Sequence, residues 1–476
     1  MEAQSTLIAS IDKFLTTGTE ILFNNIVFYV FIVVAILFTV LLKGSQFKYV
    51  FHAGSLLFAK HHGGGTSGFA SYAISTASRV GTGNMAGIMV AISVGGPGAL
   101  FWMWMMALFG SALAFAEGTL AQLYKEKNSL GQYVGGASFY IRSKLKLPVL
   151  SLIFAVIMIL TYTAFNGVQA NTIAGALSSY NLDPSITGIV LSIIIAFILL
   201  SPGRTAIIKA CTYIVPVMAI PFILFGLVVI LMNITMIPHV FYVIITQAFM
   251  PEAAFGGAIG HTMATGLRRG LFSNEAGMGG APHAAAAATT THPARQGFIQ
   301  MFTDTLIICS VSGFILLLSP EAMAKIGELK GINLMQYAMN THFGQFGSLF
   351  ITLCVVLFAF SSILGNFFYI QTGVTAIKDS KLSYYIVVVM TLMLVLGGSI
   401  ANLTTIWNLG DFLMGFMALI NIIVLVMLYK PVTALLNNYI SQWNQEKIPV
   451  YIKGDIPEIE TDAVTQWDGS DADSVK

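Results

Sequence analysis

Two long apolar segments of this sequence are interrupted by glycines and polar residues, at 78–87 in the first half of the chain and at 270–283 in the second. A helix broken inside the hydrocarbon core leaves backbone N–H and C=O groups without partners, which hydrocarbon does not tolerate. Such breaks persist where they line a cavity or bind a ligand. Two of them at corresponding positions of two halves are typical of the binding site of a secondary transporter. The sequence therefore predicts a transporter.

The rest of the chain is also strongly apolar. Hydrophobic residues make up 56% of the 476 residues and charged residues only 9%, which excludes a soluble globular protein. About 20 apolar residues suffice to cross a bilayer. We predict eleven such spans, at 21–42, 67–93, 97–123, 147–172, 185–201, 208–232, 253–290, 296–318, 346–370, 383–400 and 404–429.

The basic residues predict the orientation of these spans, because cytoplasmic loops carry an excess of lysine and arginine. With the N-terminus outside, the external loops hold only Lys13, Lys325 and Lys330. The internal loops then hold Lys43, Lys48, Lys60, Lys125, Lys127, Arg142, Lys144, Lys146, Arg204, Lys209, Arg268, Arg269, Arg295, Lys378 and Lys381. We therefore expect residues 1–20 to form an external segment and residues 442–476 to form a polar cytoplasmic tail.

Three segments outside the spans carry their own expectations. The tail is acidic, through residues that include Asp471 and Asp473, and we expect an unstructured, solubilising end. The basic segment 124–146 is expected to form an amphipathic helix at the membrane surface. The segment 319–345 is the longest external loop.

The spans divide into two halves. Setting aside 21–42 as an extra peripheral helix leaves ten spans, five in 67–232 and five in 253–430, and each half begins with an interrupted span. Because five is odd, the halves insert with opposite orientations. This is the logic of inverted-repeat transporters.

Five runs of residues resemble the sodium:alanine/glycine symporter family of bacterial and archaeal amino-acid carriers. They are Gly81-Thr82-Gly83-Asn84-Met85-Ala86-Gly87, Gly95-Gly96-Pro97-Gly98-Ala99, Phe115-Ala116-Glu117-Gly118-Thr119-Leu120, Gly270-Leu271-Phe272-Ser273-Asn274-Glu275-Ala276-Gly277-Met278-Gly279 and Ala359-Phe360-Ser361-Ser362-Ile363-Leu364-Gly365. The resemblance implies an all-α integral membrane fold, the leucine-transporter-like repeat of five plus five helices preceded by one extra helix. It also implies Na⁺ as the coupling ion and a bacterial cytoplasmic membrane as the location.

The first break offers two kinds of ligand. The N–H groups of Gly81, Thr82 and Gly83, at the positive end of a half-helix, suit the carboxylate of an amino acid. Freed carbonyls such as that of Val80, together with the Asn84 amide oxygen, suit Na⁺. Two alternatives are glycines that only let helices pack closely and a nucleotide-binding glycine loop. The second is rejected because that motif follows a strand.

Two further spans carry candidate substrate contacts. Asn166 and Gln169 are three residues apart and share a helical face. They could simply join helices, but the resemblance implies that Gln169 faces the substrate. Asn366 stands where many family members carry tryptophan, and Gln371 where a glutamate often follows. Ile370 on the same face and Met278 in the second break are further candidate contacts. An amide at 366 makes the pocket larger and more polar than an indole would, which would suit glutamine, serine or asparagine as well as alanine.

Adjacent hydroxyls at Ser361 and Ser362 lie in another apolar span. They could bond back to their own helix, as such hydroxyls commonly do. The resemblance implies instead that they complete a Na⁺ site with carbonyls of the first break.

Charged groups at membrane depth are functional candidates by default, and they usually pair. Those predicted here, as gating groups or internal ion pairs, are Arg79, Glu117, Glu275, Asp304 and Asp411. Arg79 is the only basic residue that we place well inside a span, and we expect it to neutralise one of the four acids. Structural pairing is favoured over substrate contact for Arg79. His283 is expected to be a packed histidine rather than a metal ligand.

The function predicted from these features is Na⁺-coupled uptake of a small neutral amino acid, of the alanine/glycine class, by alternating access. A Na⁺- or H⁺-coupled carrier of glutamine, serine or asparagine is the alternative within the class. An ion channel and a membrane enzyme are the alternatives outside it. A channel would need a symmetric pore or a carbonyl filter, and an enzyme a convergent catalytic set. The partners expected are the amino acid and the lipid bilayer, with no nucleic acid and no obligate protein partner.

Overall fold

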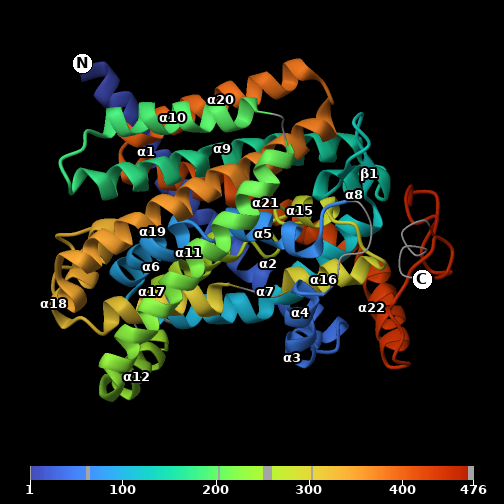
Figure 1. The fold of residues 1–476 in the computed structure, drawn as a ribbon, viewed down its shortest axis with the longest axis horizontal. Helices are drawn as coiled ribbons and strands as arrows, with labels where there is room; N and C mark the ends of the chain where they lie inside the picture. Colours follow the sequence, from blue (N-terminus) through green and yellow to red (C-terminus); the bar gives the residue numbers. More distant parts are fainter. Residues whose placement is uncertain (1, 60–64, 202–203, 250–259, 302–303, 470–476) are drawn as a thin grey trace.

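The structure is a computed structural model that describes residues 2–59, 65–201, 204–249, 260–301 and 304–469. Lys60, the start of the predicted span 253–290 and the tail residues Asp471 and Asp473 lie outside these ranges. The described chain is mostly helical, and most of its long helices run along the long axis of the molecule (Figure 1). Its one sheet is a hairpin of two short antiparallel strands, β1 (Glu126–Lys127) and β2 (Tyr133–Val134).

The first half of the chain contains the helices up to residue 248. They are α1 (Glu2–Leu22), a π-helical turn (Phe23–Val27), α2 (Phe28–Leu41), α3 (Ser45–Lys48), α4 (Val50–Leu57), α5 (Gly68–Arg79), α6 (Thr82–Gly95), α7 (Gly98–Leu123), α8 (Ala137–Ser143), α9 (Pro148–Ser178), α10 (Pro184–Leu200), α11 (Arg204–Met232), a 3₁₀ turn (Ile234–Met236) and α12 (Ile237–Ala248).

The second half begins with a further interrupted helix. Its helices are α14 (His261–Asn274), α15 (Pro282–Ala287), α16 (Pro293–Met301), α17 (Thr305–Leu317), α18 (Pro320–Met323), α19 (Ile332–Ile377), α20 (Lys381–Ile400), α21 (Leu403–Met427) and α22 (Tyr429–Trp443). The α19 helix is kinked at Gly344, whose φ of 62° is non-helical.

Eight helices among the described residues are long and apolar enough to cross a membrane. Each of them overlaps one of the predicted spans. The other three predicted spans are 67–93 and 253–290, which are interrupted, and 185–201, whose helix α10 has only 17 residues. A polytopic membrane fold is therefore confirmed, and the count of eleven spans stays a prediction.

Helix packing places the two interrupted helices at the centre. The α9 helix contacts α19, α20 and α21, and α7 contacts α14 and α16. The first interrupted helix lies between these groups, because α5 contacts α11 and α19 while α6 contacts α14 and α17. Every residue from Ser71 to Met89 is buried. The polar residues of this stretch must therefore find partners inside the protein.

One end of the molecule carries the hairpin, α8, α22 and the tail, and we call it the hairpin end (Figure 1). The expectation of a single amphipathic helix over 124–146 is wrong, because these residues form the hairpin and the short helix α8. Gly131, in the turn between β1 and β2, and Gly136, directly before α8, adopt φ values of 74° and 119°, a conformation that glycine tolerates best.

The expectation of an unstructured tail is also wrong for the part that the structure describes. Tyr451, Val464 and Trp467 are buried. The Trp467 indole N–H donates to the Gln122 carbonyl at 3.0 Å, and the Tyr451 N–H donates to the Thr291 carbonyl at 2.9 Å. Apolar residues spaced through the acidic segment therefore pack it against the hairpin end. The prediction rested on the average acidity of the tail and did not weigh these individual apolar residues.

The tail is also held by one exposed ion pair at the hairpin end. The Lys144 ammonium lies 2.6 Å from the Glu460 carboxylate. This contact lowers the pKa of Glu460. Since Glu460 is largely exposed, the pair contributes little to stability.

Candidate substrate and ion site

The first break is a two-residue interruption between α5 and α6. Helix α5 ends at Arg79 and α6 begins at Thr82, with Val80 and Gly81 in non-helical conformations between them. A Cβ atom at Gly81 would lie 2.2 Å from the Ser362 Oγ and 2.9 Å from the Gln169 Oε1. Only glycine fits there, because neither contact is sterically allowed.

The N-terminus of α6 donates two hydrogen bonds to side chains. The Gly81 N–H donates to the Asn84 Oδ1 at 3.3 Å, and the Thr82 N–H donates to the Gln169 Oε1 at 3.0 Å. The first N–H groups of a helix have no partner within it and attract negative charge. The structure thus brings Gln169 of α9 onto the group that the sequence suggested for a carboxylate.

The two adjacent serines of α19 face different neighbours. The Ser362 hydroxyl donates to the Ala77 carbonyl at 2.7 Å and lies 3.4 Å from the Val80 carbonyl. Both serines also bond back to their own helix, because the Phe358 carbonyl lies 2.9 Å from the Ser361 hydroxyl and 3.0 Å from the Ser362 hydroxyl. The Ser361 hydroxyl lies 3.3 Å from the Met218 sulfur of α11. Ser362 therefore meets the first break in this structure, whereas Ser361 is turned toward α11.

Asn84 connects α6 with the second half of the chain. Its amide donates to the Ser273 hydroxyl at 3.1 Å and to the Asp304 carboxylate at 3.2 Å. Its backbone carbonyl accepts from the Ser312 hydroxyl at 2.5 Å. Ser273 belongs to α14, and Asp304 and Ser312 belong to α17 and its N-cap, so Asn84 joins α6 to two helices of the second half.

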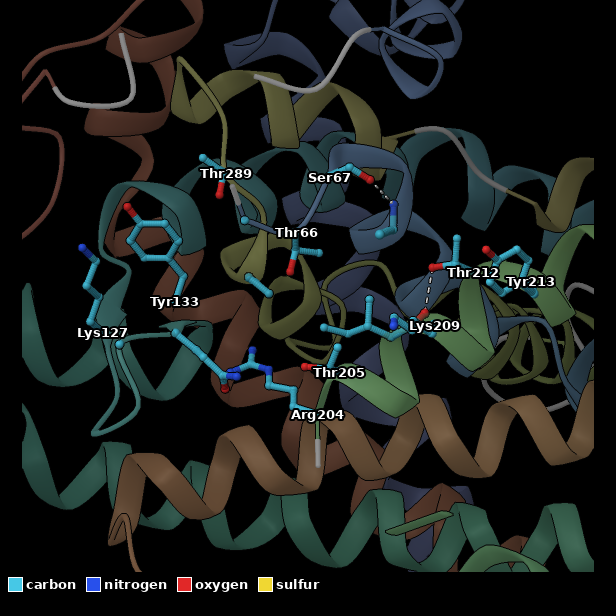
Figure 2. Close-up of a pocket in the computed structure, with 16 residues that line it drawn as sticks. Thr66, Ser67, Lys127, Tyr133, Arg204, Thr205, Lys209, Thr212, Tyr213 and Thr289 are labelled. Carbon is cyan, nitrogen blue, oxygen red and sulfur yellow. Dashed lines mark hydrogen bonds between the residues drawn. The ribbon is translucent and has the colours of Figure 1, made fainter. Parts of the chain in front are cut away.

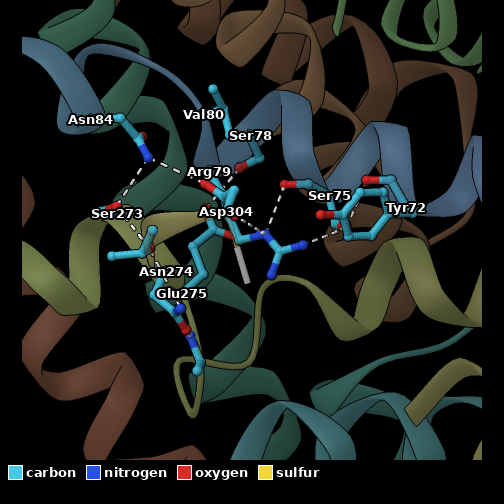
Figure 3. A network of polar contacts seen from close by, with 12 residues as sticks. Tyr72, Ser75, Ser78, Arg79, Val80, Asn84, Ser273, Asn274, Glu275 and Asp304 are labelled. Carbon is cyan, nitrogen blue, oxygen red and sulfur yellow. Dashed lines mark hydrogen bonds and ion pairs between the residues drawn. The ribbon is translucent and has the colours of Figure 1, made fainter. Parts of the chain in front are cut away.

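Arg79 pairs with Asp304, as Figure 3 shows. The guanidinium Nε lies 3.8 Å from the Asp304 Oδ1, and the Nη2 donates to the Ser75 hydroxyl at 3.2 Å. Both charged side chains are at least 95% buried. Of the four acids that the sequence left open, Asp304 is the one that neutralises Arg79.

The second break lies between α14 and α15. Glu275, Gly277 and Gly279 all adopt positive φ there. The Ser78 hydroxyl lies 2.8 Å from the Glu275 Oε1 and 2.6 Å from the Asn366 Oδ1, which joins the two breaks directly. The Asn366 amide donates in turn to the Asn166 Oδ1 at 2.9 Å. Asn366 therefore faces polar side chains of α5 and α9.

Glu117 of α7 holds the backbone of the second break. Its Oε2 accepts from the Gly277 N–H at 3.1 Å, and its Oε1 accepts from the Asn421 amide at 2.5 Å. The same amide lies 3.0 Å from the Gly277 carbonyl. The sequence analysis missed Asn421, although an amide in the apolar span 404–429 is a usable signal. Met278, beside this group, is fully buried.

Asp411 of α21 pairs with Arg269 in direct contact and has the Arg268 Nε at 3.8 Å. The placement of Arg268 and Arg269 in an internal loop is wrong. Both belong to α14, and Arg268 lines a cavity of about 360 Å³ with Lys330, far along the chain in the segment predicted to be external. Arg79 is thus not the only buried basic residue. Two adjacent arginines in a sequence predict a loop outside the membrane. Their contacts with the buried Asp411 show instead that they lie inside the helical fold.

Three aromatic rings cover the start of α6, and the sequence analysis proposed none of them as a site residue. The Phe272 ring lies 4.5 Å from the Phe165 ring and 5.0 Å from the Trp407 ring, between centroids. A Cβ atom at Gly83 would lie 2.5 Å from the Phe272 ring. An apolar wall therefore lies beside the start of α6, next to the polar groups of the break, and small-molecule sites usually combine apolar walls with a few polar groups.

The site so defined is that of a membrane transporter: two broken helices, joined by hydrogen bonds at the centre of a polytopic helical fold, with an aromatic wall beside them. The sodium:alanine symporter family model matches residues 8–453. The chain belongs to this family.

Named relatives agree. The amino-acid carrier protein AlsT of Bacillus subtilis is 41% identical over 90% of this chain and 92% of its own length. The probable sodium/glutamine symporter GlnT of the same organism is 40% identical over 81% of this chain and 81% of its own length. The sodium/alanine symporter AgcS of Methanococcus maripaludis is 37% identical over 79% of this chain and 86% of its own length. The family and these relatives are transporters and not enzymes, which confirms the class predicted from the sequence.

Proposed function

We propose that this chain couples the entry of Na⁺ to the uptake of a small neutral amino acid across a bacterial cytoplasmic membrane. The observation that carries the proposal is the first break. There, helix N-terminal N–H groups and freed carbonyls lie within one residue of each other, so one segment offers ligands for both a carboxylate and a cation. Neither the carboxylate site nor the cation site is complete unless the break is ordered. Binding of one ligand therefore favours binding of the other, which couples the ion to the substrate.

The carboxylate site is assigned to Gly81, Thr82 and Gly83. The Thr82 N–H donates a hydrogen bond to the Gln169 Oε1 in the present structure. A substrate carboxylate would replace this oxygen, and the Gln169 amide nitrogen would then donate to the carboxylate. Asn166, Asn366, Met278 and Ile370 are proposed to surround the rest of the substrate, with the aromatic wall beside Gly83.

The Na⁺ site is assigned to the Val80 carbonyl and the Ser362 hydroxyl, with the Ala77 carbonyl as a neighbour. Ser362 supports this because its hydroxyl lies 2.7 Å from the Ala77 carbonyl in the last turn of α5 and 3.4 Å from the Val80 carbonyl of the break. Ser361 and Asn84 remain proposed ligands. Ser361 would have to rotate away from Met218, and Asn84 would have to release the Gly81 N–H. Neutral hydroxyl and carbonyl oxygens suit Na⁺ better than a proton, for which Glu275 or Asp304 would have to titrate.

The driving force is adequate for concentrative uptake. One charge crossing a potential of 100 mV releases about 2.3 kcal/mol. A tenfold ion gradient adds about 1.4 kcal/mol. Together these terms support an accumulation of about several hundredfold.

Alternating access is proposed to use the two halves, 67–232 and 253–430, as an inverted repeat of five plus five helices after the peripheral span 21–42. The hairpin end is assigned to the cytoplasm, because Lys43, Lys127, Arg142 and Lys144 cluster there. The buried contact of Arg269 with Asp411 then lies on the outer side of the site and is proposed to close it. Glu117 and Glu275 are assigned to positioning the second break.

Glutamine is the second candidate substrate. It is favoured by Asn366, whose amide meets Asn166 where a family tryptophan would form an apolar wall. A polar side chain of the substrate would find hydrogen-bonding partners at this amide pair. Serine and asparagine fit the same reasoning.

Gln169→Glu tests the carboxylate site. The substitution keeps the shape of the side chain but sets a negative charge against the substrate carboxylate, and like charges in contact cost several kcal/mol. We expect binding of labelled alanine to the purified protein in Na⁺ to weaken about a hundredfold or more. Displacement by unlabelled glycine and glutamine in the same assay ranks the candidate substrates.

Gln169→Leu is the matched neutral control. It removes the hydrogen bond without adding charge, so it should weaken alanine binding much less than Gln169→Glu. Unchanged affinity in Gln169→Glu would place the carboxylate elsewhere.

A further inference from the structure

A large cavity opens at the hairpin end beside the start of α11 (Figure 2). Its volume is about 880 Å³, and its walls come from the start of α5, the start of α11, the hairpin and residues 287–289. The lining residues include Lys127, Arg204 and Lys209, and no aspartate or glutamate is among those that line it in the described chain. The cavity therefore carries three formal positive charges without a compensating acid.

Arg204 is the buried basic residue of this cavity. Its side chain is only 7% exposed, its guanidinium lies 4.3 Å from the Phe368 ring, and its Nη2 has no hydrogen-bond partner within the described residues. A buried charged donor without an acceptor is costly. The arrangement therefore fits an anionic acceptor supplied by a ligand, and a guanidinium suits phosphate oxygens in particular.

The cavity continues onto an exposed face of α11. Lys209, Tyr213, Val217, Ile220 and Leu224 follow one another at spacings of three and four, so they lie along one side of the helix. The last four are 56–73% exposed. The sequence of a basic, an aromatic and then aliphatic side chains matches the headgroup, interface and hydrocarbon layers of a bilayer.

We propose that this cavity binds the phosphate headgroup of an anionic phospholipid. Arg204 and Lys209 hold the phosphate, and an acyl chain lies along the exposed face of α11. Charge complementarity and the continuity of the cavity with this apolar face favour a lipid over a soluble anion, because a free phosphate would leave the face unused. Basic pockets between transmembrane helices bind such headgroups in general.

The bound lipid would also contact both interrupted helices. Thr66 and Thr289 line the cavity, and the Thr289 N–H donates to the Thr66 carbonyl at 2.9 Å. Thr66 precedes α5 and Thr289 follows α15. The lipid would therefore sit against the segments that lead to the two breaks, whatever substrate the protein carries.

Native mass spectrometry of the detergent-purified protein, titrated with phosphatidylglycerol or phosphatidylcholine, tests the proposal. We expect one phosphatidylglycerol to bind with preference over phosphatidylcholine. Lys209→Gln and Arg204→Gln should each weaken it about fivefold, since a basic group near such a headgroup is worth about that factor. Lys378→Gln removes an exposed charge at the same end outside the cavity and should change nothing. Because Lys209 is exposed, Lys209→Gln should fold normally and still measures the contribution of a basic group to lipid binding if Arg204→Gln fails to fold.

Inorganic phosphate and glycerol phosphate distinguish the two sources of phosphate. If either one stabilises the protein against heat in an Arg204-dependent manner while phosphatidylglycerol shows no preference, the site takes a soluble anion and the lipid proposal is overturned. Equal binding of phosphatidylglycerol to the wild type, Lys209→Gln and Lys378→Gln would overturn it as well.

Discussion

Replacing Gly81 by alanine should strongly slow transport while leaving membrane insertion intact. The added Cβ would meet the Ser362 Oγ at 2.2 Å and the Gln169 Oε1 at 2.9 Å. These two groups are the proposed cation ligand and the proposed carboxylate contact, so the single methyl group displaces both. Overpacking of this kind costs about 1–3 kcal/mol, which corresponds to a loss in uptake rate of about fivefold to 150-fold.

Gly87→Ala is the matched control for Gly81→Ala. Gly87 lies in α6, six residues after Gly81, and its Cβ would make an ordinary contact of 3.5 Å with the Trp407 ring. Uptake by Gly87→Ala should stay close to that of the wild type, measured in proteoliposomes with equal protein content. Full activity in Gly81→Ala would mean that the close approach at the break has no part in binding.

Arg79→Gln should be the most destabilising single change among the charged residues of the site. It leaves the Asp304 carboxylate buried without its cation, and removing one partner of a buried ion pair costs about 3–5 kcal/mol. We expect a marked fall in the temperature at which the detergent-purified protein loses its monodisperse peak in size-exclusion chromatography.

The double variant Arg79→Gln, Asp304→Asn separates charge from packing. It removes both charges and keeps an oxygen at position 304 to accept from the Asn84 amide, so it should recover much of the lost stability. If the double variant is no more stable than Arg79→Gln, Asp304 does not compensate Arg79.

The two breaks could be predicted from the sequence because glycines and polar residues in an apolar segment have one physical consequence at membrane depth. The partner of Arg79 could not. Arg79 and Asp304 are more than 200 residues apart in sequence and are brought together because α17 packs against α6, the helix that follows the break. Glu117, Glu275 and Asp411 were equally charged candidates and are also buried. Only the fold distinguishes them.

The adjacent serines illustrate a second limit. Successive residues of a helix point about 100° apart, so a dipeptide rarely presents both side chains to one neighbour. The resemblance to the family suggested both Ser361 and Ser362, whereas the structure brings Ser362 alone to the first break. The polar tail shows the converse. Its average composition predicts disorder, but individual buried residues such as Trp467 determine where it lies.

The aromatic wall lay beyond sequence reasoning for a similar reason. Phe165, Phe272 and Trp407 come from three helices, α9, α14 and α21, that lie far apart in the sequence. Nothing in their spacing sets them apart from residues that face lipid. Their role follows only from the clash that a side chain at Gly83 would make with Phe272.

Uptake of labelled alanine by proteoliposomes tests the central claim most directly, with Na⁺ or choline outside, the proton gradient collapsed and the membrane potential fixed. The account predicts uptake in Na⁺ and none in choline. It also predicts that Ser362→Ala raises the Na⁺ concentration for half-maximal uptake, because one oxygen ligand is lost. Equal uptake in Na⁺ and choline, for alanine and for glutamine alike, would contradict it.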